Sequence, residues 1–66
     1  MNFQELNYIL CIAKHQNLTK AAQELYISQP TLTKYLQRLE REVNGKLFVR
    51  SGNSYTATYL GRRYME

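Results

Sequence analysis

The chain has 66 residues, a formal net charge of +4 and a pI near 9.5. A chain of this length forms one domain at most and buries only about 60% of its unfolded surface, which excludes a second, substrate-binding domain and a deep catalytic cleft. The charge suits an acidic partner, but simple solubility explains it equally well, so the positions of the basic residues must decide between the two.

The sequence shows no feature of membrane insertion or secretion. No apolar run approaches the roughly 18 residues that a membrane span requires, and no secretory signal is recognisable. The single cysteine, Cys11, cannot form an internal disulfide, which favours a reducing compartment. We therefore expect a soluble, cytoplasmic protein with no membrane partner, in which Cys11 packs in the core rather than acting as a nucleophile.

The first helix is predicted over residues 3–15, where apolar side chains recur every three or four positions. The stripe consists of Phe3, Leu6, Leu10 and Ala13, widened by Ile9. We expect this stripe to face the core. The polar residues around it are expected to be solvated: Gln4, Glu5, Asn7, Lys14 and Gln16.

A second, shorter helix is predicted to follow Asn17, whose side chain can cap free backbone N–H groups at a helix start. One face of this helix is apolar or small: Leu18, Ala21, Ala22 and Leu25. The two alanines are small where neighbouring helices must approach closely. We place a tight turn at residues 26–28, with Ile27 in contact with the core.

The third helix is predicted over about residues 29–43, with Ser28 as its N-cap and Pro30 in its first turn, where a missing N–H is harmless. Its inner stripe is apolar: Leu32, Leu36, Leu39 and Val43. Its opposite face is polar and basic: Pro30, Thr33, Lys34, Gln37, Arg38 and Arg41. A short helix, a tight turn and a longer helix with a cationic outer face are typical of a helix-turn-helix, whose second helix enters the DNA major groove.

After a predicted helix end at Asn44-Gly45, residues 46–50 and 55–58 have the composition of two short strands. The residues between them favour a turn, so we predict a β-hairpin, which in this position is a wing. Thr58 is expected to cap a last helix at residues 59–66. The predicted fold class is mainly α: a three-helix winged helix-turn-helix with a two-stranded β-hairpin wing and the start of a fourth helix.

Several short motifs occur together in this chain at characteristic distances. They are Ala21-Ala22, Leu25, Ser28-Gln29-Pro30-Thr31-Leu32-Thr33-Lys34, Leu39-Glu40, Leu47-Phe48-Val49-Arg50 and Thr58-Tyr59-Leu60-Gly61. In this combination the chain resembles, over nearly its whole length, the N-terminal winged helix-turn-helix domain of LysR-type transcriptional regulators.

The resemblance implies sequence-specific binding of double-stranded DNA, with the helix at about 29–43 in the major groove and the wing at about 46–58 on the adjacent backbone or minor groove. It implies dyad-symmetric half-sites and a homodimer or tetramer of the full-length protein. Residues 1–58 would form the DNA-binding domain and residues 59–66 the start of a truncated linker helix. No cofactor is expected in this domain, because a small-molecule inducer would bind a C-terminal domain.

Base contacts are expected from the N-terminal part of the third helix. Gln29 can contact adenine through two hydrogen bonds, although simple exposure or capping is the alternative. Pro30 and Thr31 can meet a thymine methyl group, and Lys34 can reach phosphate or guanine. Backbone contacts are expected from Lys20, Thr33, Gln37, Arg38, Arg50 and Asn53. For Arg50 the alternative is a structural ion pair with a glutamate, and Arg41 is equally compatible with pairing to Glu40 or Glu42.

The chain departs from the family pattern at three positions. Val43-Asn44 replaces the usual Leu-Gly at the end of the recognition helix, which we expect to leave the fold unchanged because Asn tolerates the left-handed conformation. Asn53-Ser54 stands at the wing tip, where the family often has an arginine, and Ala57-Thr58 replaces Leu-Thr. We expect the last two changes to weaken the wing.

Two other functions compete with this interpretation. A winged helix can serve protein contact instead of DNA binding, but the outer face of the third helix is polar and basic rather than apolar. A DNA-binding appendage of an enzyme is the second alternative. The sequence contains no catalytic residue set, phosphate-binding glycine loop or metal-ligand spacing, so we expect no enzymatic activity and no metal.

Overall fold

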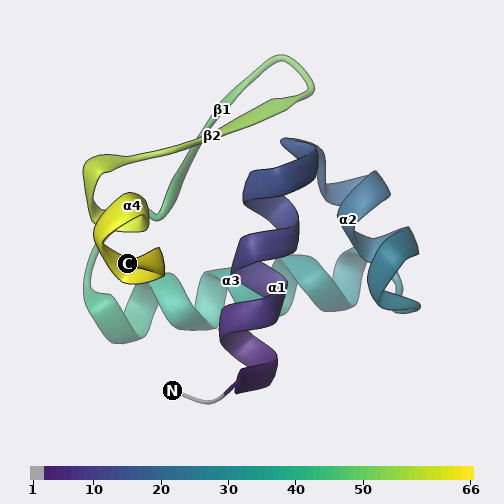
Figure 1. Ribbon diagram of the computed structural model, residues 1–66, viewed down its shortest axis with the longest axis horizontal. Coiled ribbons are helices and arrows are strands. Elements are labelled where there is room, and N and C mark those ends of the chain that lie inside the picture. Colours follow the sequence, from purple (N-terminus) through teal and green to yellow (C-terminus); the bar gives the residue numbers. More distant parts are fainter. Residues whose placement is uncertain (1–2) are drawn as a thin grey trace.

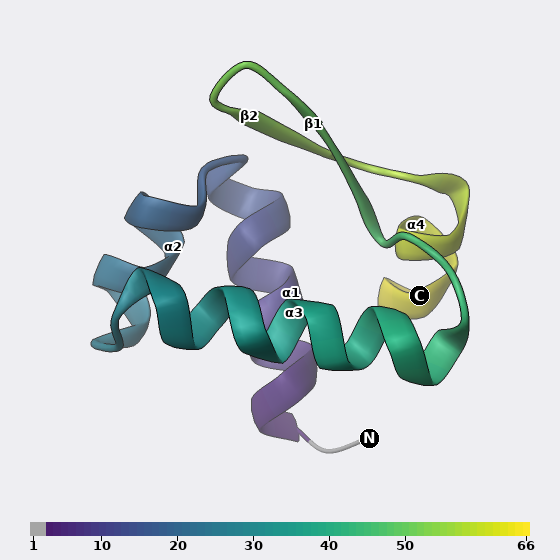
Figure 2. The same cartoon turned by 180° about the vertical axis from the view of Figure 1, so that it is seen from behind.

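The computed structural model describes residues 3–66. Its elements, in chain order, are α1 (Phe3–His15), α2 (Leu18–Leu25), α3 (Gln29–Val43), β1 (Phe48–Ser51), β2 (Ser54–Ala57) and α4 (Tyr59–Met65). α1 crosses α3, α2 packs beside α1 near the N-terminal end of α3, and α4 lies near its C-terminal end (Figure 1). The antiparallel hairpin of β1 and β2 extends back toward the N-terminal end of α3 (Figure 2). The predicted fold class is therefore confirmed.

Side-chain caps set the starts of the last three helices, as the sequence predicts. The side-chain oxygens of Asn17, Ser28 and Thr58 accept the backbone N–H groups of Lys20 (2.9 Å), Thr31 (3.2 Å) and Gly61 (3.0 Å). These bonds satisfy donors that have no partner inside the helix. At the other end of α3, Asn44 adopts a left-handed conformation with φ of 58°, so the predicted helix end is confirmed.

The core lies between α1, α2, α3 and the segment before β1. Its fully buried large side chains are Ile9, Ile12, Leu32, Leu39 and Leu47. Ala21 and Ala22 are also buried, which confirms that small residues lie where α2 meets its neighbours. Cys11 is 5% exposed, so its predicted place in the core is confirmed too. Within the described residues, no helix has both the length and the apolar character needed to cross a membrane.

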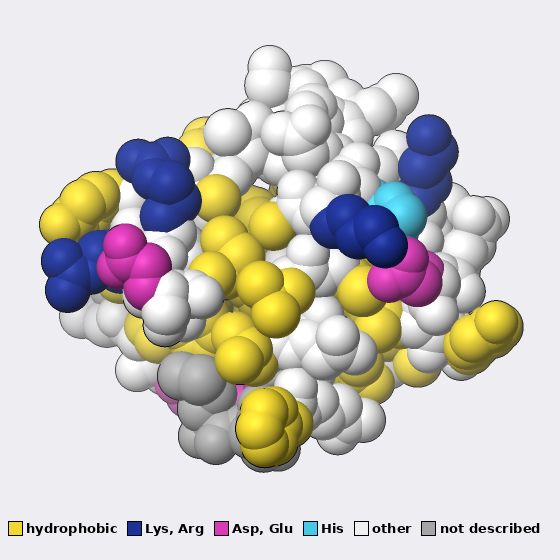
Figure 3. Space-filling view, viewed as in Figure 1, with side chains coloured by type: hydrophobic (Ala, Val, Ile, Leu, Met, Phe, Trp, Pro, Cys, Tyr) yellow, Lys and Arg dark blue, Asp and Glu magenta, His cyan; other side chains and the backbone are white. Residues whose placement is uncertain are grey.

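The predicted inner face of α1 is partly wrong, since Ile9 is buried and Ala13 packs against the core as expected, but two other members of the stripe are exposed. Phe3 is 90% exposed and Leu10 is 44% exposed, whereas the buried residues of α1 are Glu5, Tyr8, Ile9, Cys11 and Ile12. Apolar residues lie on more than one side of this helix, so periodicity alone does not choose between the two faces. Hydrophobic side chains are exposed across the middle of the face in Figure 3, where α1 lies in the same view in Figure 1. Glu5, expected to be solvated, is buried.

The strands are shifted by one or two residues from their predicted positions. Lys46 and Leu47 precede β1, and the hairpin closes with Ser51 opposite Ser54. Leu47 is fully buried, and its carbonyl oxygen accepts the N–H of Thr58 at 3.0 Å. A side chain on Gly61 would place a Cβ atom 2.1 Å from the same carbonyl oxygen. The glycine therefore allows α4 to pack directly on the backbone at the base of the wing.

Candidate nucleic-acid interface

The N-terminal end of α3 and the tip of the wing line one shallow groove. Its volume is about 270 Å³, and it is lined by Asn17, Leu18, Thr19, Gln29, Arg50, Asn53 and Tyr55. Three residues predicted to contact DNA, Gln29 on α3 and Arg50 and Asn53 on the wing, therefore lie together although more than 20 positions separate the helix residue from the other two. The groove also includes residues at the start of α2.

A second groove, of about 330 Å³, runs between α3 and the wing. Thr33 and Gln37 of α3 and Arg50 of β1 line it, so three of the predicted backbone-contacting residues share this surface. Thr33 is half-buried. The remaining predicted contact residues are exposed: Lys20, Gln29, Pro30, Thr31, Lys34, Gln37, Arg38, Arg50 and Asn53. The wing-side flank of α3, defined here as Gln29, Thr33 and Gln37, thus faces β1 and β2 across an open groove.

One backbone hydrogen bond ties the wing to the end of α1, and a second hydrogen bond stabilises the hairpin itself. The backbone N–H of Tyr55 in β2 donates to the carbonyl oxygen of Gln16, at the end of α1, over 3.0 Å. Within the hairpin, Arg50 donates from Nε to the carbonyl oxygen of Gly52 over 2.9 Å. The alternative expected for Arg50, an ion pair with a glutamate, is not found among residues 3–66.

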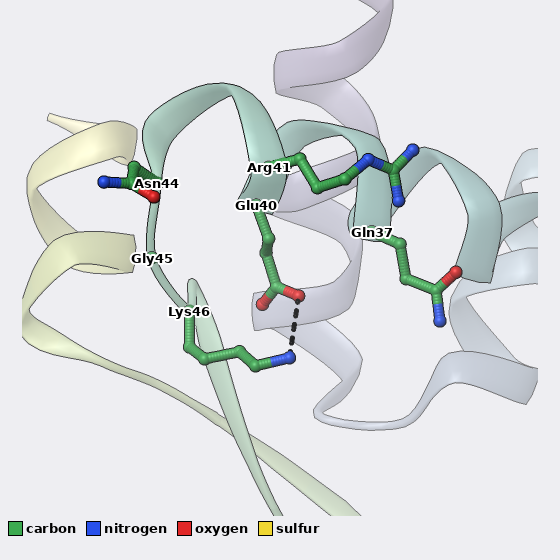
Figure 4. A pocket seen from close by; sticks show the side chains of 6 residues that line it. All are labelled: Gln37, Glu40, Arg41, Asn44, Gly45 and Lys46. Carbon is green, nitrogen blue, oxygen red and sulfur yellow. Dashed lines mark ion pairs between the residues drawn. The ribbon is translucent and has the colours of Figure 1, made fainter.

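Glu40 joins the end of α3 to the start of the wing. Its carboxylate accepts the backbone N–H of Leu47 at 2.8 Å and lies 3.7 Å from Nζ of Lys46. Figure 4 shows this ion pair in a hollow of about 390 Å³, with Gln37 and Arg41 extending away from it. The structure therefore gives Glu40 a partner other than Arg41. The sequence indicated Glu40 as part of the Leu-Glu motif and as one possible partner of Arg41, but it did not indicate this positioning role.

Arg38 lies on the other flank of α3 and contacts α1. Its Nη2 atom donates to Oε1 of Glu5, whose side chain is 7% exposed. The guanidinium carbon also lies 5.3 Å from the ring centroid of Tyr35, within the range of a cation–π contact. The ring of Tyr35 in turn meets that of Tyr8 edge to face, with centroids 4.9 Å apart. No sequence pattern indicated that Glu5 would pair with the predicted DNA-contacting Arg38.

A separate polar cluster fastens α1 to α2 around Glu24. Its carboxylate accepts the Cys11 thiol at 2.9 Å and Lys14 at 3.0 Å, and it lies 3.0 Å from Nε2 of His15. These hydrogen bonds lower the pKa of Glu24 to about 2. Burial, reinforced by the hydrogen bond to Glu24, raises the pKa of Cys11 to about 11, so the thiol stays protonated near neutral pH. The cluster therefore has a structural role.

Comparison with known proteins agrees with the family resemblance seen in the sequence. The model of the family described as bacterial regulatory helix-turn-helix protein, lysR family, matches residues 3–62. The HTH-type transcriptional regulator CitR of Bacillus subtilis (strain 168) is 40% identical over 65 residues, which are 98% of this chain and 22% of CitR. The uncharacterized HTH-type regulator YcgK of the same strain is 42% identical over 66 residues, which are 100% of this chain and 20% of YcgK. The chain spans about a fifth of the length of these relatives.

Two solved structures of protein–DNA complexes have the same fold. The CbnR_DBD–DNA complex superposes with a TM-score of 0.90 at 32% identity, covering 98% of this chain and 75% of that one. The complex of BenM_DBD with benA site 1 DNA has the same score and identity, covering 98% of this chain and 73% of that one.

Proposed function

The chain belongs to the lysR family of bacterial regulatory helix-turn-helix proteins, and we propose that it is the sequence-specific DNA-binding domain of a transcriptional regulator. α3 enters the major groove of double-stranded DNA, and the wing lies on the adjacent backbone or minor groove. One observation carries this proposal: Gln29, at the N-terminus of α3, shares a groove with Arg50 and Asn53 of the wing. A duplex edge placed on that groove meets both elements at once.

Sequence is read by the exposed residues of the first two turns of α3. Gln29 contacts adenine N6 and N7, which contributes about 1–3 kcal/mol of discrimination against a wrong base. The hydroxyl oxygen of Thr31 accepts a hydrogen bond from Ser28 at 2.8 Å, so the methyl group of Thr31 is left to contact thymine, together with Pro30. Lys34 follows one turn later and contacts guanine or phosphate.

The backbone is contacted from α2, α3 and the wing. The proposed residues are Lys20, Thr33, Gln37, Arg50 and Asn53. Arg50 uses only Nε for its hydrogen bond to Gly52, which leaves its two terminal nitrogens for a phosphate. Lys20 lies in the first turn of α2, where the free N–H groups of the helix also favour an anion. Arg38 is not included among these proposed backbone contacts, because its guanidinium binds Glu5.

CitR and YcgK are about five times as long as this chain, so the proposal extends to a longer protein with further domains. We propose a cytoplasmic regulator without enzymatic activity that acts as a homodimer or tetramer on dyad-symmetric half-sites. A small-molecule inducer would bind a C-terminal domain of that protein, and this DNA-binding domain would need no cofactor. Its relatives CitR and YcgK are named as HTH-type transcriptional regulators, which supports the regulatory role.

Selection of bound sequences from a pool of random duplexes, followed by titration of the selected and a scrambled duplex, tests the proposal. Each phosphate neutralised by a lysine or arginine contributes about −0.9 to the slope of log K against log salt concentration. With Lys20, Lys34 and Arg50 each neutralising one phosphate, we expect a slope of about −3 for one domain. We also expect tighter binding of the selected duplex than of the scrambled one. Absence of duplex binding, or equal binding of both duplexes, would contradict the proposal and favour a protein-contact role.

A further inference from the structure

The ion pair between Glu5 and Arg38 joins α1 to the side of α3 that turns away from the wing. At 3.6 residues per turn, neighbouring residues of a helix are about 100° apart. Arg38 therefore lies about 180° around α3 from Gln29 and about 100° from Gln37. Because Gln29, Thr33 and Gln37 line the grooves shared with the wing, Arg38 lies outside the wing-side flank.

The carboxylate of Glu5 binds α3 and lies near α4. Glu5 belongs to α1 and is 5% exposed as a residue, and Arg38 of α3 donates to it. Tyr64 of α4 is close enough that the negative charge of Glu5 adds to burial in raising the pKa of the Tyr64 hydroxyl. Arg38 thus offsets part of the cost of burying this carboxylate, and its loss weakens the link between α1 and α3.

The guanidinium of Arg38 also contacts an aromatic ring. The guanidinium lies over Tyr35, and the Tyr35 ring packs edge to face on Tyr8 of α1. A guanidinium bound on one side by a carboxylate and on the other by a ring has given up much of its freedom to follow a phosphate. The side chain, which is 49% exposed, is thus oriented by Glu5 of α1 and Tyr35 of α3.

From this geometry we infer that Arg38 is a positioning residue that fixes the angle of α3 on α1 through Glu5, and that it is not a phosphate contact. The inference rests on the proposed DNA-binding function. It separates two roles that are indistinguishable in the sequence, since Lys34 and Arg38 are both cations on the polar face of α3. Lys34 supplies charge to DNA, whereas Arg38 keeps the recognition helix at the angle at which Gln29 reads bases.

The test compares Arg38→Met with Lys34→Met, a matched control that removes the same charge from the same helix. Methionine keeps an apolar stem against Tyr35. Affinity for the selected and the scrambled duplex is measured between about 50 and 200 mM salt, the range over which phosphate contacts change affinity strongly. We expect Lys34→Met to reduce the magnitude of the salt slope by about 0.9. Arg38→Met keeps the parental slope but loses about tenfold of the preference for the selected duplex.

Glu5→Gln provides an independent readout. Removal of a negative charge from a DNA-binding protein ordinarily strengthens binding to any duplex. Here we expect Glu5→Gln to reduce the preference for the selected duplex, and we expect the double variant Glu5→Gln, Arg38→Met to lose no more preference than either single variant. If Glu5→Gln unfolds at the assay temperature, the salt slope of Arg38→Met decides, because a positioning residue leaves it at the parental value, whereas loss of a phosphate contact reduces its magnitude by about 0.9.

The outcomes separate the inference from the proposed function. A slope reduced by about 0.9 in Arg38→Met would show a phosphate contact and overturn the inference while the proposed function stands. Unchanged discrimination in folded Arg38→Met and folded Glu5→Gln would also overturn it. If the parent chain binds no duplex, the proposed function fails and the inference fails with it.

Discussion

Gln16 holds a left-handed backbone conformation between α1 and α2, with φ of 53°. Such a conformation costs an ordinary L-residue about 1–2 kcal/mol, because Cβ approaches the following carbonyl oxygen, and glycine avoids this contact. The carbonyl oxygen of Gln16 accepts the Tyr55 N–H, so the conformation also helps to hold the wing. The strained backbone of Gln16 therefore coincides with the hydrogen bond that joins the end of α1 to β2.

We expect Gln16→Gly to raise the free energy of unfolding by about 1 kcal/mol, measured by urea denaturation. Asn44→Gly is the matched control, since Asn44 has φ of 58° but asparagine tolerates this region, so a gain of only a few tenths of a kcal/mol is expected. A loss of stability in Gln16→Gly would show that the side chain, and not the backbone, matters at this position.

The lowered pKa of Glu24 makes the stability of the fold depend on pH. Its pKa is lowered to about 2 by hydrogen bonds from Cys11, Lys14 and His15, so the folded state favours the ionised form. A lowered pKa contributes stability above the pKa of the unfolded chain, about 4.3, and this contribution is lost as pH falls from about 5 through 2. The difference in melting temperature between the parent and Glu24→Gln should therefore shrink over that range.

Glu42→Gln serves as the control for this pH titration, because Glu42 is an exposed glutamate of α3. Its melting temperature should follow that of the parent across the range. If the difference between the parent and Glu24→Gln stays constant from pH 7 to pH 2, the polar cluster does not stabilise the contact between α1 and α2.

Individual residues show which contacts the sequence could predict and which it could not. The helix caps Asn17, Ser28 and Thr58 were predictable because each acts on a backbone group three residues away. The burial of Glu5 was not, because its partner Arg38 lies 33 positions later and an acidic residue among polar neighbours usually indicates solvent. Helix caps were therefore predictable from neighbouring residues, whereas an ion pair between residues far apart in the sequence was not.

At the scale of elements, the wing contains two of the three positions at which, from the sequence, we expect a departure from the family pattern. The hairpin is short, with β1 and β2 of four residues each, and its turn places Asn53 beside the groove that contains Gln29. An arginine at this tip would gain from the strong negative potential of a narrow, A·T-rich minor groove, which asparagine does not exploit.

Asn53→Arg should therefore tighten DNA binding and sharpen the preference for A·T-rich flanks of the bound site. Titration of duplexes that differ only in their flanks measures the effect, and Asn53→Gln controls for side-chain length without charge. Equal affinities of the parent and Asn53→Arg on A·T-rich flanks would exclude a minor-groove contact at the wing tip.

Element boundaries followed from sequence more closely for helices than for strands. The third helix was predicted at 29–43 and observed at Gln29–Val43, because a cap, a proline and a left-handed asparagine mark its ends. The strands lay one or two residues away, since Leu47 is as apolar as a strand residue but is buried ahead of β1. The inner face of α1 depends on how α1 packs on α3, which periodicity does not contain.

At the scale of the whole molecule, the contacts of Glu40, Gln16 and Gly61 place the wing beside α3. Glu40 ties the segment before β1 to α3, Gln16 accepts β2, and Gly61 lets α4 approach the base of the wing. The sequence predicted α3 and the wing as the two DNA-contacting elements, whereas the groove that joins them follows only from these tertiary contacts. The proposed reading of DNA depends on this joint placement of α3 and the wing.

Gln29→Ala combined with Lys34→Ala tests that placement most directly. The matched control is Gln4→Ala combined with Lys14→Ala, which removes the same two types of side chain from α1. Because Lys14 binds Glu24, the melting temperature of this control is measured first to establish that it is folded. Affinity for the selected and the scrambled duplex at one salt concentration is the measurement. We predict that the α3 variant binds the selected duplex about 10- to 100-fold more weakly and loses most of its preference, while the α1 variant keeps the preference. Retention of both affinity and preference by the α3 variant would contradict the account.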